Sequence, residues 1–198
     1  WEVLDRRVLD VLGEIKREDF VPVRHRKLAF ADLALPLAHG ETMLKPVLEG
    51  RLLQALDLKP TDDVLQIGAG SGFLSACLAR LARAVHALEL HPDLAAEAQR
   101  RLDAAEIANV RLECADAATW STEQRFDAIL VGGAVAELPQ RFADWLKPGG
   151  RLVAVRGQAP VQEAVCAYAE AAGLRVESLL ETDIPYLRGF APQARFAL

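Results

Sequence analysis

The sequence has few cysteines, which already limits the kind of protein it encodes. Cys77, Cys114 and Cys166 are the 3 cysteines among 198 residues. Because they are odd in number and far apart, they argue against a disulfide scaffold and favour a reducing, cytoplasmic compartment. We expect all three to behave as small buried apolar side chains.

Long hydrophobic runs and an excess of positive charge are also missing. No apolar run reaches the roughly 18 residues that a membrane-spanning helix needs, and no segment resembles a signal peptide. The net charge of -5 gives no means of attracting nucleic acid or an anionic membrane. The histidines show none of the spacings of metal-ligating motifs. We therefore expect no nucleic acid, no membrane and no metal as a partner.

The composition is that of a globular chain. Its 198 residues suit a single domain, and 52% of them are hydrophobic, enough for a sizeable core. The chain contains no long linker, low-complexity segment or internal repeat. Because it begins at Trp1 rather than at a methionine, we expect further residues to precede it.

From residue 61 onward, strand-like apolar runs alternate with helical patterns. Strands are predicted at residues 64–67, 85–90, 110–114, 126–131, 151–155 and 174–180. Helices are predicted at residues 71–82, 93–105, 138–145 and 161–171, a turn at 147–150, and a candidate last edge strand at 193–198. This alternation is typical of an α/β fold with a doubly wound, mostly parallel sheet and helices on both faces.

The first 60 residues follow a different pattern. Residues 1–15 and 47–56 predict helices, whereas residues 20–40 are irregular. Because the later part already accounts for a complete sheet, we expect residues 1–60 to form an N-terminal cap and substrate loop on a domain of residues 61–198.

A glycine-rich turn follows the first predicted strand. Gly68, Gly70 and Gly72 occupy every second position of GAGSG in VLQIGAGSGF. A dinucleotide fingerprint reads G-x-G-x-x-G, but Phe73 stands where its third glycine would fall. The turn therefore favours a ligand that has no phosphate and lies close to bare backbone, as S-adenosylmethionine would. A glycine turn without any ligand is the alternative.

Two carboxylates follow at the ends of the next strands. Glu89 lies about 20 residues after Gly68, where a carboxylate can accept both hydroxyls of a ribose. Asp116 follows the third strand, near the expected place of an adenine amino group, although an aspartate there also fits a plain helix cap. Because ligands bind beyond the carboxyl ends of parallel strands, we expect these residues to meet at one site.

These residues resemble the class I S-adenosylmethionine-dependent methyltransferases. A closer resemblance is carried by FVPVRHRKLAFADLALPLAHGETM, residues 20–43, which is similar to the N-terminal region of the protein-L-isoaspartate O-methyltransferases. It continues through DDVLQIGAGSGFLSACLA, FDAILVGGAVAELPQRF and LKPGGRLVAVRG, and so covers nearly the whole chain. The resemblance implies a seven-stranded, Rossmann-like methyltransferase sheet with an N-terminal helical cap.

The resemblance also implies a reaction. A methyl group would pass from S-adenosylmethionine to the α-carboxylate of an L-isoaspartyl residue in a protein or peptide, leaving S-adenosylhomocysteine. A carboxylate with a pKa of about 4 is already ionised at neutral pH, so the reaction needs placement more than a base. In the matching loop, Thr42 and His39 would lie over the reacting centre. The residues that the resemblance assigns to cofactor binding are Gly68, Ala69, Gly70, Gly72, Glu89, Leu90, Asp116 and Ala117.

The chain departs from the family at three places. Leu44 stands where the family has an active-site serine, and leucine cannot donate a hydrogen bond to the substrate carboxylate; the adjacent Lys45 is either a substitute cation or a solvated surface lysine. Gln66 stands where an acidic residue is usual and brings no charge to the cofactor's ammonium or sulfonium. Residues 132–135 also differ, at the border of the expected substrate pocket.

The departures concern the methyl acceptor more than the fold. They leave two alternatives to isoaspartyl methylation: transfer to another carboxylate or small molecule, and a protein that binds the cofactor without turnover. An NAD-dependent oxidoreductase is disfavoured by Phe73. Whether residues 186–190 close over the pocket is left open by the sequence.

Overall fold

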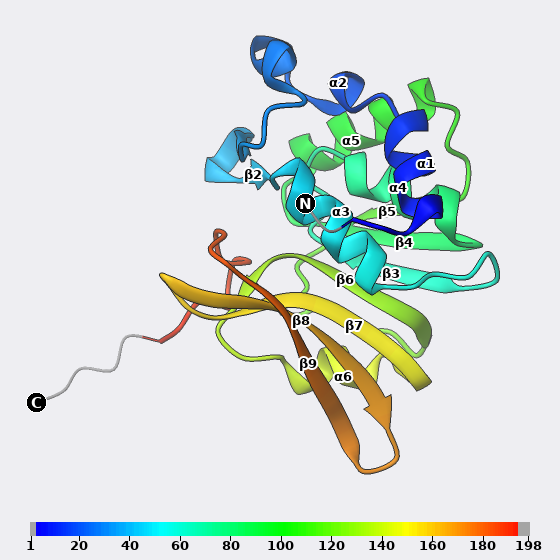
Figure 1. Cartoon of the computed structure of the whole chain (residues 1–198), viewed down its shortest axis with the longest axis vertical. Helices are drawn as coiled ribbons and strands as arrows, with labels where there is room; N and C mark the ends of the chain where they lie inside the picture. Colours follow the sequence, from blue (N-terminus) through cyan, green and yellow to red (C-terminus); the bar gives the residue numbers. More distant parts are fainter. Residues whose placement is uncertain (1–2, 194–198) are drawn as a thin grey trace, which may run out of the picture.

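A seven-stranded sheet runs through the computed structural model, which describes residues 3–193 (Figure 1). Its strand order is β5-β4-β3-β6-β7-β8-β9. The pairs from β5 to β7 are parallel, and β8 and β9 add antiparallel strands at one edge. The strands are β3 (Asp63–Ile67), β4 (Ala84–Glu89), β5 (Val110–Cys114), β6 (Phe126–Val135), β7 (Leu146–Gln158), β8 (Val161–Glu170) and β9 (Gly173–Thr182). The expected fold class is confirmed.

Helices cover both faces of this sheet. They are α1 (Arg6–Glu14), α2 (Arg17–Phe20), α3 (Pro46–Ala55), α4 (Phe73–Leu81), α5 (Pro92–Ala104) and α6 (Gln140–Asp144), with short 3-10 turns η1 (Val23–Leu28) and η2 (Ala38–Gly40). Between η1 and α3, the chain forms a small antiparallel pair, β1 (Leu35–Pro36) and β2 (Thr42–Met43). In the described residues 3–193, no helix is long and apolar enough to cross a membrane.

The core is divided by the sheet into two apolar layers. Because side chains alternate along a strand, Val64 packs in the layer under α1, α3 and α4, while its neighbour Leu65 packs in the opposite layer. The second layer contains the stacked rings of Phe142 and Trp145, whose centroids are 5.4 Å apart. The central parallel strands β3, β4 and β6 are buried on both faces, whereas the edge strands β5 and β9 are more exposed.

One predicted helix is wrong. Residues 161–171 form β8, because only Ala159 and Pro160 separate Gln158 from its antiparallel partner Val161 in a tight hairpin. The alanines of this segment favour a helix, but Ala164 and its neighbours are fully buried between β7 and β9. Tertiary packing therefore outweighs the local preference.

Smaller differences concern element boundaries. The first helix begins at Arg6 rather than at residue 1, because the Asp5 side chain caps it by accepting a hydrogen bond from the Arg7 backbone at 2.8 Å. The predicted turn at 147–150 lies inside β7, where it shifts the register against β6. The candidate edge strand Gln193–Leu198 lies outside the described residues except for Gln193.

The expectation for the cysteines is correct for two of the three. Cys77 and Cys166 are buried, whereas Cys114 is exposed. The reason is its position at the end of β5, the edge strand of the sheet, which has no neighbour on its outer side. All three are free thiols.

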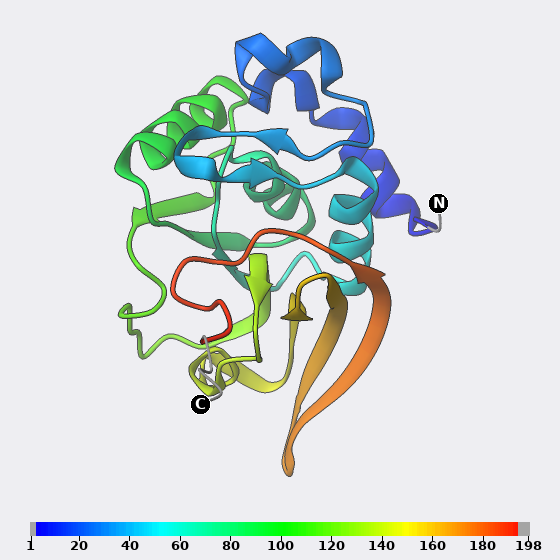
Figure 2. The same ribbon diagram turned by 90° about the vertical axis from the view of Figure 1, so that its left-hand side faces the viewer.

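The segment after β9 returns to the middle of the sheet (Figure 2). The Ala134 backbone in β6 donates to the Pro185 carbonyl at 2.9 Å, and the Leu187 backbone donates to the Ala134 carbonyl at 2.8 Å. These two bonds form an isolated bridge beside the end of β6. Residues 183–193, called here the tail, are thereby held over the carboxyl edge of the sheet.

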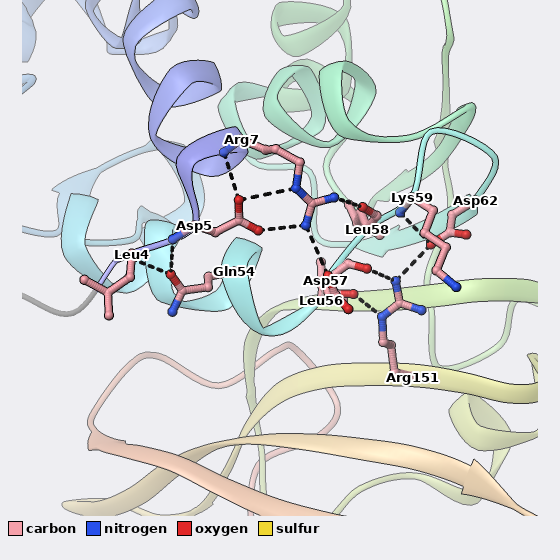
Figure 3. Close-up of polar contacts among 10 residues, drawn as sticks. All are labelled: Leu4, Asp5, Arg7, Gln54, Leu56, Asp57, Leu58, Lys59, Asp62 and Arg151. Atoms are coloured by element: carbon pink, nitrogen blue, oxygen red, sulfur yellow. Dashed lines mark hydrogen bonds and ion pairs between the residues drawn. The ribbon is translucent and has the colours of Figure 1, made fainter.

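An arginine connects the sheet to the linker between α3 and β3 (Figure 3). Arg151 of β7 donates from Nε to the Leu56 carbonyl and from Nη2 to the Asp57 carbonyl. Nη2 also lies 2.9 Å from the Asp62 carboxylate, and both charged side chains are largely buried. One guanidinium therefore satisfies three acceptors at the end of α3.

A second arginine fixes the N-terminal helix to the same linker. Arg7 of α1 donates to the Leu58 carbonyl at 2.7 Å and pairs with the Asp5 carboxylate. The Asp5 side chain has its pKa lowered by the hydrogen bond from Arg7. Gln54 of α3 accepts from the Asp5 backbone at 2.8 Å, so the chain before α1 is also held. Figure 3 shows both arginines converging on one stretch of backbone.

The substitution Arg151→Ala is expected to lower the free energy of unfolding by about 3 kcal/mol, because it leaves buried acceptors and the Asp62 charge without their donor. Urea denaturation measures this change. The control is Arg6→Ala, which removes an exposed ion pair with Asp10 and should change stability by less than about 0.5 kcal/mol. Equal effects of the two substitutions would contradict this account of Arg151.

Candidate active site

An open cleft lies at the carboxyl ends of β3, β4, β5 and β6. It is lined by the residues that follow these strands, by the loop that carries β2, and by the tail that returns after β9. The lining residues are Glu41, Thr42, Leu44, Ile67, Gly68, Gly70, Leu88, Glu89, Leu90, Ala115, Asp116, Ala117, Gly132, Gly133, Pro185, Leu187 and Arg188. The sheet topology thus brings together most of the residues that the sequence singled out.

The glycine turn presents bare backbone to this cleft. Gly68 has φ +81 and Gly70 has φ +56, both in the left-handed region that favours glycine. The backbone N–H groups of Gly68 and Ala69 both donate to the Leu88 carbonyl, at 2.9 and 3.0 Å. A Cβ built on Gly70 would lie 3.4 Å from Leu37. That is ordinary van der Waals contact, so the turn is fixed to β4 and favours glycine through its positive φ angles rather than through lack of space.

The third glycine has a different place. Gly72 has φ +87 and precedes α4 directly. A Cβ there would lie 3.2 Å from Ala98 of α5, so this glycine permits close packing of α4 against α5. It does not line the cleft. Ala69 does not line the cleft either, but it lines a smaller pocket of about 300 Å³ beside it, called here the adjoining pocket.

Glu89 serves the turn and faces the cleft. Its side chain is 5% exposed, and its oxygens accept from the Gly70 backbone at 2.8 Å and the His91 backbone at 3.0 Å. A carboxylate oxygen has more than one acceptor position, so Glu89 keeps capacity for donors of a ligand. Leu90 follows it in the cleft wall.

Asp116 caps a turn rather than the helix that one interpretation of the sequence expected, because no helix lies in the described residues between β5 and β6. Its Oδ1 accepts from the Ala118 backbone at 2.8 Å at the start of this turn. It also lines the cleft next to Ala117. The cap orients the carboxylate without using all of its acceptor positions.

Close backbone contact explains the two glycines near the end of β6, Gly132 and Gly133. A Cβ on Gly132 would lie 2.6 Å from the Gly68 carbonyl, and a Cβ on Gly133 would lie 2.9 Å from the Leu187 backbone nitrogen. Side chains at either position would push the strand away from the turn or from the tail. The residues at 132–135 therefore bring the glycine turn, β6 and the tail together.

Of the loop residues singled out from the sequence, two line the cleft and two do not. Thr42 and Leu44 line both the cleft and the adjoining pocket. Lys45 is exposed and does not line either one. His39 lies away from the cleft, where its ring stacks on His91 at 4.1 Å and its Nε2 lies 2.8 Å from a carboxylate oxygen of Asp93. The hydrogen bond from His39 lowers the pKa of Asp93.

Gln66 lies below the turn rather than in the cleft. It is fully buried, and its Oε1 accepts from the Ser75 hydroxyl at 2.6 Å. Its Nε2 lies 3.4 Å from the Gly68 carbonyl. The side chain thus connects β3 to α4 and to the turn, and it remains neutral.

The sequence interpretation missed a buried ion pair beneath the loop. Glu49 of α3 lines the adjoining pocket and is 2% exposed. Arg17 of α2 donates to it from Nε at 2.9 Å and from Nη2 at 3.2 Å. Desolvation outweighs the attraction of Arg17 and raises the pKa of Glu49 to about 7. The available signal was a glutamate on the inner side of the predicted helix 47–56.

The comparisons with known proteins agree with this geometry. The sequence model for "Protein-L-isoaspartate(D-aspartate) O-methyltransferase (PCMT)" matches residues 2–182. A protein-L-isoaspartate O-methyltransferase 2 of Anaeromyxobacter sp. (strain Fw109-5) is 38% identical over 190 residues, covering 94% of this chain and 78% of that protein. A protein-L-isoaspartate O-methyltransferase of Roseiflexus sp. (strain RS-1) is 35% identical over 191 residues, covering 96% and 88%.

A solved structure has the same fold over nearly its whole length. It comes from Plasmodium falciparum and is described as a protein-L-isoaspartate O-methyltransferase in complex with S-adenosyl-L-homocysteine. The TM-score is 0.81 at 22% identity, covering 94% of this chain and 92% of that chain. At this level of identity, the likeness concerns the fold alone.

Fold, cleft and relatives define a class. The chain is an enzyme of the S-adenosylmethionine-dependent methyltransferase class, with the glycine turn and strand-end carboxylates at the carboxyl edge of its sheet. Within that class, it belongs to the protein-L-isoaspartate(D-aspartate) O-methyltransferase family.

Proposed function

We propose that this chain binds S-adenosylmethionine in the cleft and methylates the α-carboxylate of an L-isoaspartyl residue in a protein or peptide. The observation that carries the proposal is the convergence of Gly68, Glu89 and Asp116 on one cleft that Thr42 also lines. The names of the relatives, protein-L-isoaspartate O-methyltransferases, support the same acceptor.

The cleft residues suit the parts of this cofactor. Glu89 offers carboxylate acceptors to the ribose hydroxyls, and Asp116 offers one to the adenine amino group. Leu90 and Ala117 provide apolar walls for the adenine ring. The left-handed Gly68 leaves the space that the amino-acid tail needs, so the residues present fit the cofactor.

The reaction asks the protein mainly for placement. When bound, S-adenosylmethionine supplies an electrophilic methyl group on its sulfonium sulfur. The loop must hold one oxygen of the ionised acceptor carboxylate in line with that methyl group, and no protein base is needed. The Thr42 hydroxyl can donate to the carboxylate, and Arg188 of the tail lines the same cleft and offers it a cation.

Leu44 favours a second candidate. It is 5% exposed and faces the cleft where the family has a hydrogen-bond donor. An apolar side chain there suits another carboxylate or small molecule, or a chain that holds the cofactor without turnover. Isoaspartyl methylation remains the better supported function, because Thr42 and Arg188 still provide polar contacts at the cleft.

Residues 1–60 complete this arrangement in our proposal as a cap and substrate loop. The cap is held by the network around Arg7 and Arg151, and its loop contributes Thr42 and Leu44 to the cleft. We also propose a cytoplasmic location, since all three cysteines are free thiols, which a reducing compartment preserves.

The function is tested by methyl incorporation from labelled S-adenosylmethionine into a synthetic isoaspartyl peptide, with the matching aspartyl peptide as control. We expect transfer to the isoaspartyl peptide alone. Glu89→Gln should weaken this transfer, because it removes a charge from the expected ribose site. Absence of transfer by protein that binds S-adenosylhomocysteine would contradict the proposed acceptor and favour the second candidate.

Leu44→Ser tests the cost of the missing donor. Restoring a hydroxyl should raise kcat/KM for the isoaspartyl peptide by about tenfold or more, since a donor at the reacting centre stabilises the transition state. Leu44→Ala is the matched control, because it makes similar space without a donor. If alanine raises the rate as much as serine, then space rather than hydrogen bonding limits the reaction.

A further inference from the structure

The adjoining pocket shares part of its wall with the cleft. Five residues line both: Thr42, Leu44, Gly68, Gly70 and Gly132. Glu49 of α3, together with Ser71 and Phe73 beyond the glycine turn, lines this pocket, whereas Glu89 and Asp116 line only the cleft. An adenosyl group lying against Glu89 and Asp116 would therefore direct its amino-acid tail toward this pocket.

Glu49 is the one charged side chain among the described residues that line the adjoining pocket. Each of its carboxylate oxygens accepts one hydrogen bond from Arg17, at 2.9 and 3.2 Å. A carboxylate has about four acceptor positions, so half of its capacity is left. Because Glu49 lines the pocket, a donor bound there could use that capacity.

The Arg17–Glu49 pair is costly to bury, which suggests a use for it. Replacing such pairs by apolar residues is often neutral or stabilising. The raised pKa of Glu49, about 7, indicates that Arg17 alone compensates its burial incompletely. Arg17 also donates to the Ala29 carbonyl at 2.7 Å and the Leu44 carbonyl at 2.8 Å, so only part of its hydrogen-bonding capacity is directed at Glu49. A second cation beside Glu49 would stabilise the buried carboxylate further.

Because Gln66 is neutral, a carboxylate for the ammonium group of the cofactor has to come from another residue. It occupies the place in the glycine motif where the resemblance expects an acidic residue, yet it is neutral and bonded to Ser75. It is also buried beneath the turn and lines neither the cleft nor the adjoining pocket. Glu49 of α3 lines the adjoining pocket together with Gly68 and Gly70 of the same turn.

We propose that Glu49 binds the α-ammonium group of the methionine moiety of S-adenosylmethionine and of S-adenosylhomocysteine, supplying the charge that Gln66 lacks. This inference rests on the proposed cofactor site. Arg17 is a positioning residue in this arrangement: it orients the Glu49 carboxylate and holds the backbone of Leu44 at the same time.

Calorimetric titration of Glu49→Gln with two ligands tests the proposal. S-adenosylhomocysteine carries the ammonium group, whereas 5′-methylthioadenosine lacks the whole amino-acid tail. We expect the substitution to weaken S-adenosylhomocysteine by about tenfold or more and methylthioadenosine by less than about twofold. Glu163→Gln, which alters a glutamate paired with Arg156 away from the cleft, should change neither affinity.

The outcomes distinguish a wrong role for Glu49 from a wrong proposed function. Equal loss for both ligands, or no loss for either, would overturn the role of Glu49. Failure of the unaltered protein to bind S-adenosylhomocysteine would instead overturn the proposed function. These readouts do not require methyl transfer.

A measurement on the unaltered protein covers the case in which Glu49→Gln does not fold. The groups facing Glu49 are Arg17 from α2 and the Cys77 thiol from α4, whose pKa is raised well above its usual value by burial. Near pH 7, an arriving ammonium should stabilise the carboxylate and release a proton from Glu49. Calorimetry in buffers of different ionisation enthalpy should detect this release with S-adenosylhomocysteine but not with its deamino analogue; equal release with both would contradict the proposal.

Discussion

The site depends on three hydrogen bonds that backbone N–H groups of the glycine turn donate to β4. Gly68 and Ala69 donate to the Leu88 carbonyl, and Gly70 donates to the Glu89 carboxylate. These bonds fix the turn against the next strand and leave Glu89 oriented at its edge. Gly132 then approaches the turn so closely that a side chain has no space. The cleft is the volume that these backbone contacts leave open at the carboxyl edge of a parallel sheet.

Much of this geometry could be predicted from sequence, because it depends on local patterns. β3, β4 and β6, which end at the cleft, are mostly buried and apolar, and the sheet topology places Gly68, Glu89 and Asp116 together. Gly72 is also predicted to bind the cofactor, and the structure shows in addition that its missing side chain permits close packing against Ala98. A glycine motif shows where backbone is crowded, and it does not show which neighbour causes the crowding.

The features that sequence reasoning missed depend on long-range contacts. The segment 161–170 has helical composition and becomes a strand because a short hairpin places it beside β7. Cys114 is exposed because β5 has no outer neighbour. Glu49 and Arg17 are 32 residues apart, and neither lies in a recognisable pattern. They meet only because α2 packs near α3 in the folded chain. In our proposal, Glu49 then supplies the negative charge that Gln66 lacks.

The central claim is that the cleft holds an adenosyl cofactor without phosphates, and its most direct test is calorimetric titration of the protein with S-adenosylhomocysteine and, separately, with NAD. The account predicts saturable binding of S-adenosylhomocysteine at one site per chain and no measurable binding of NAD. Saturable binding of NAD, with none of S-adenosylhomocysteine, would contradict it and return the glycine turn to a dinucleotide site.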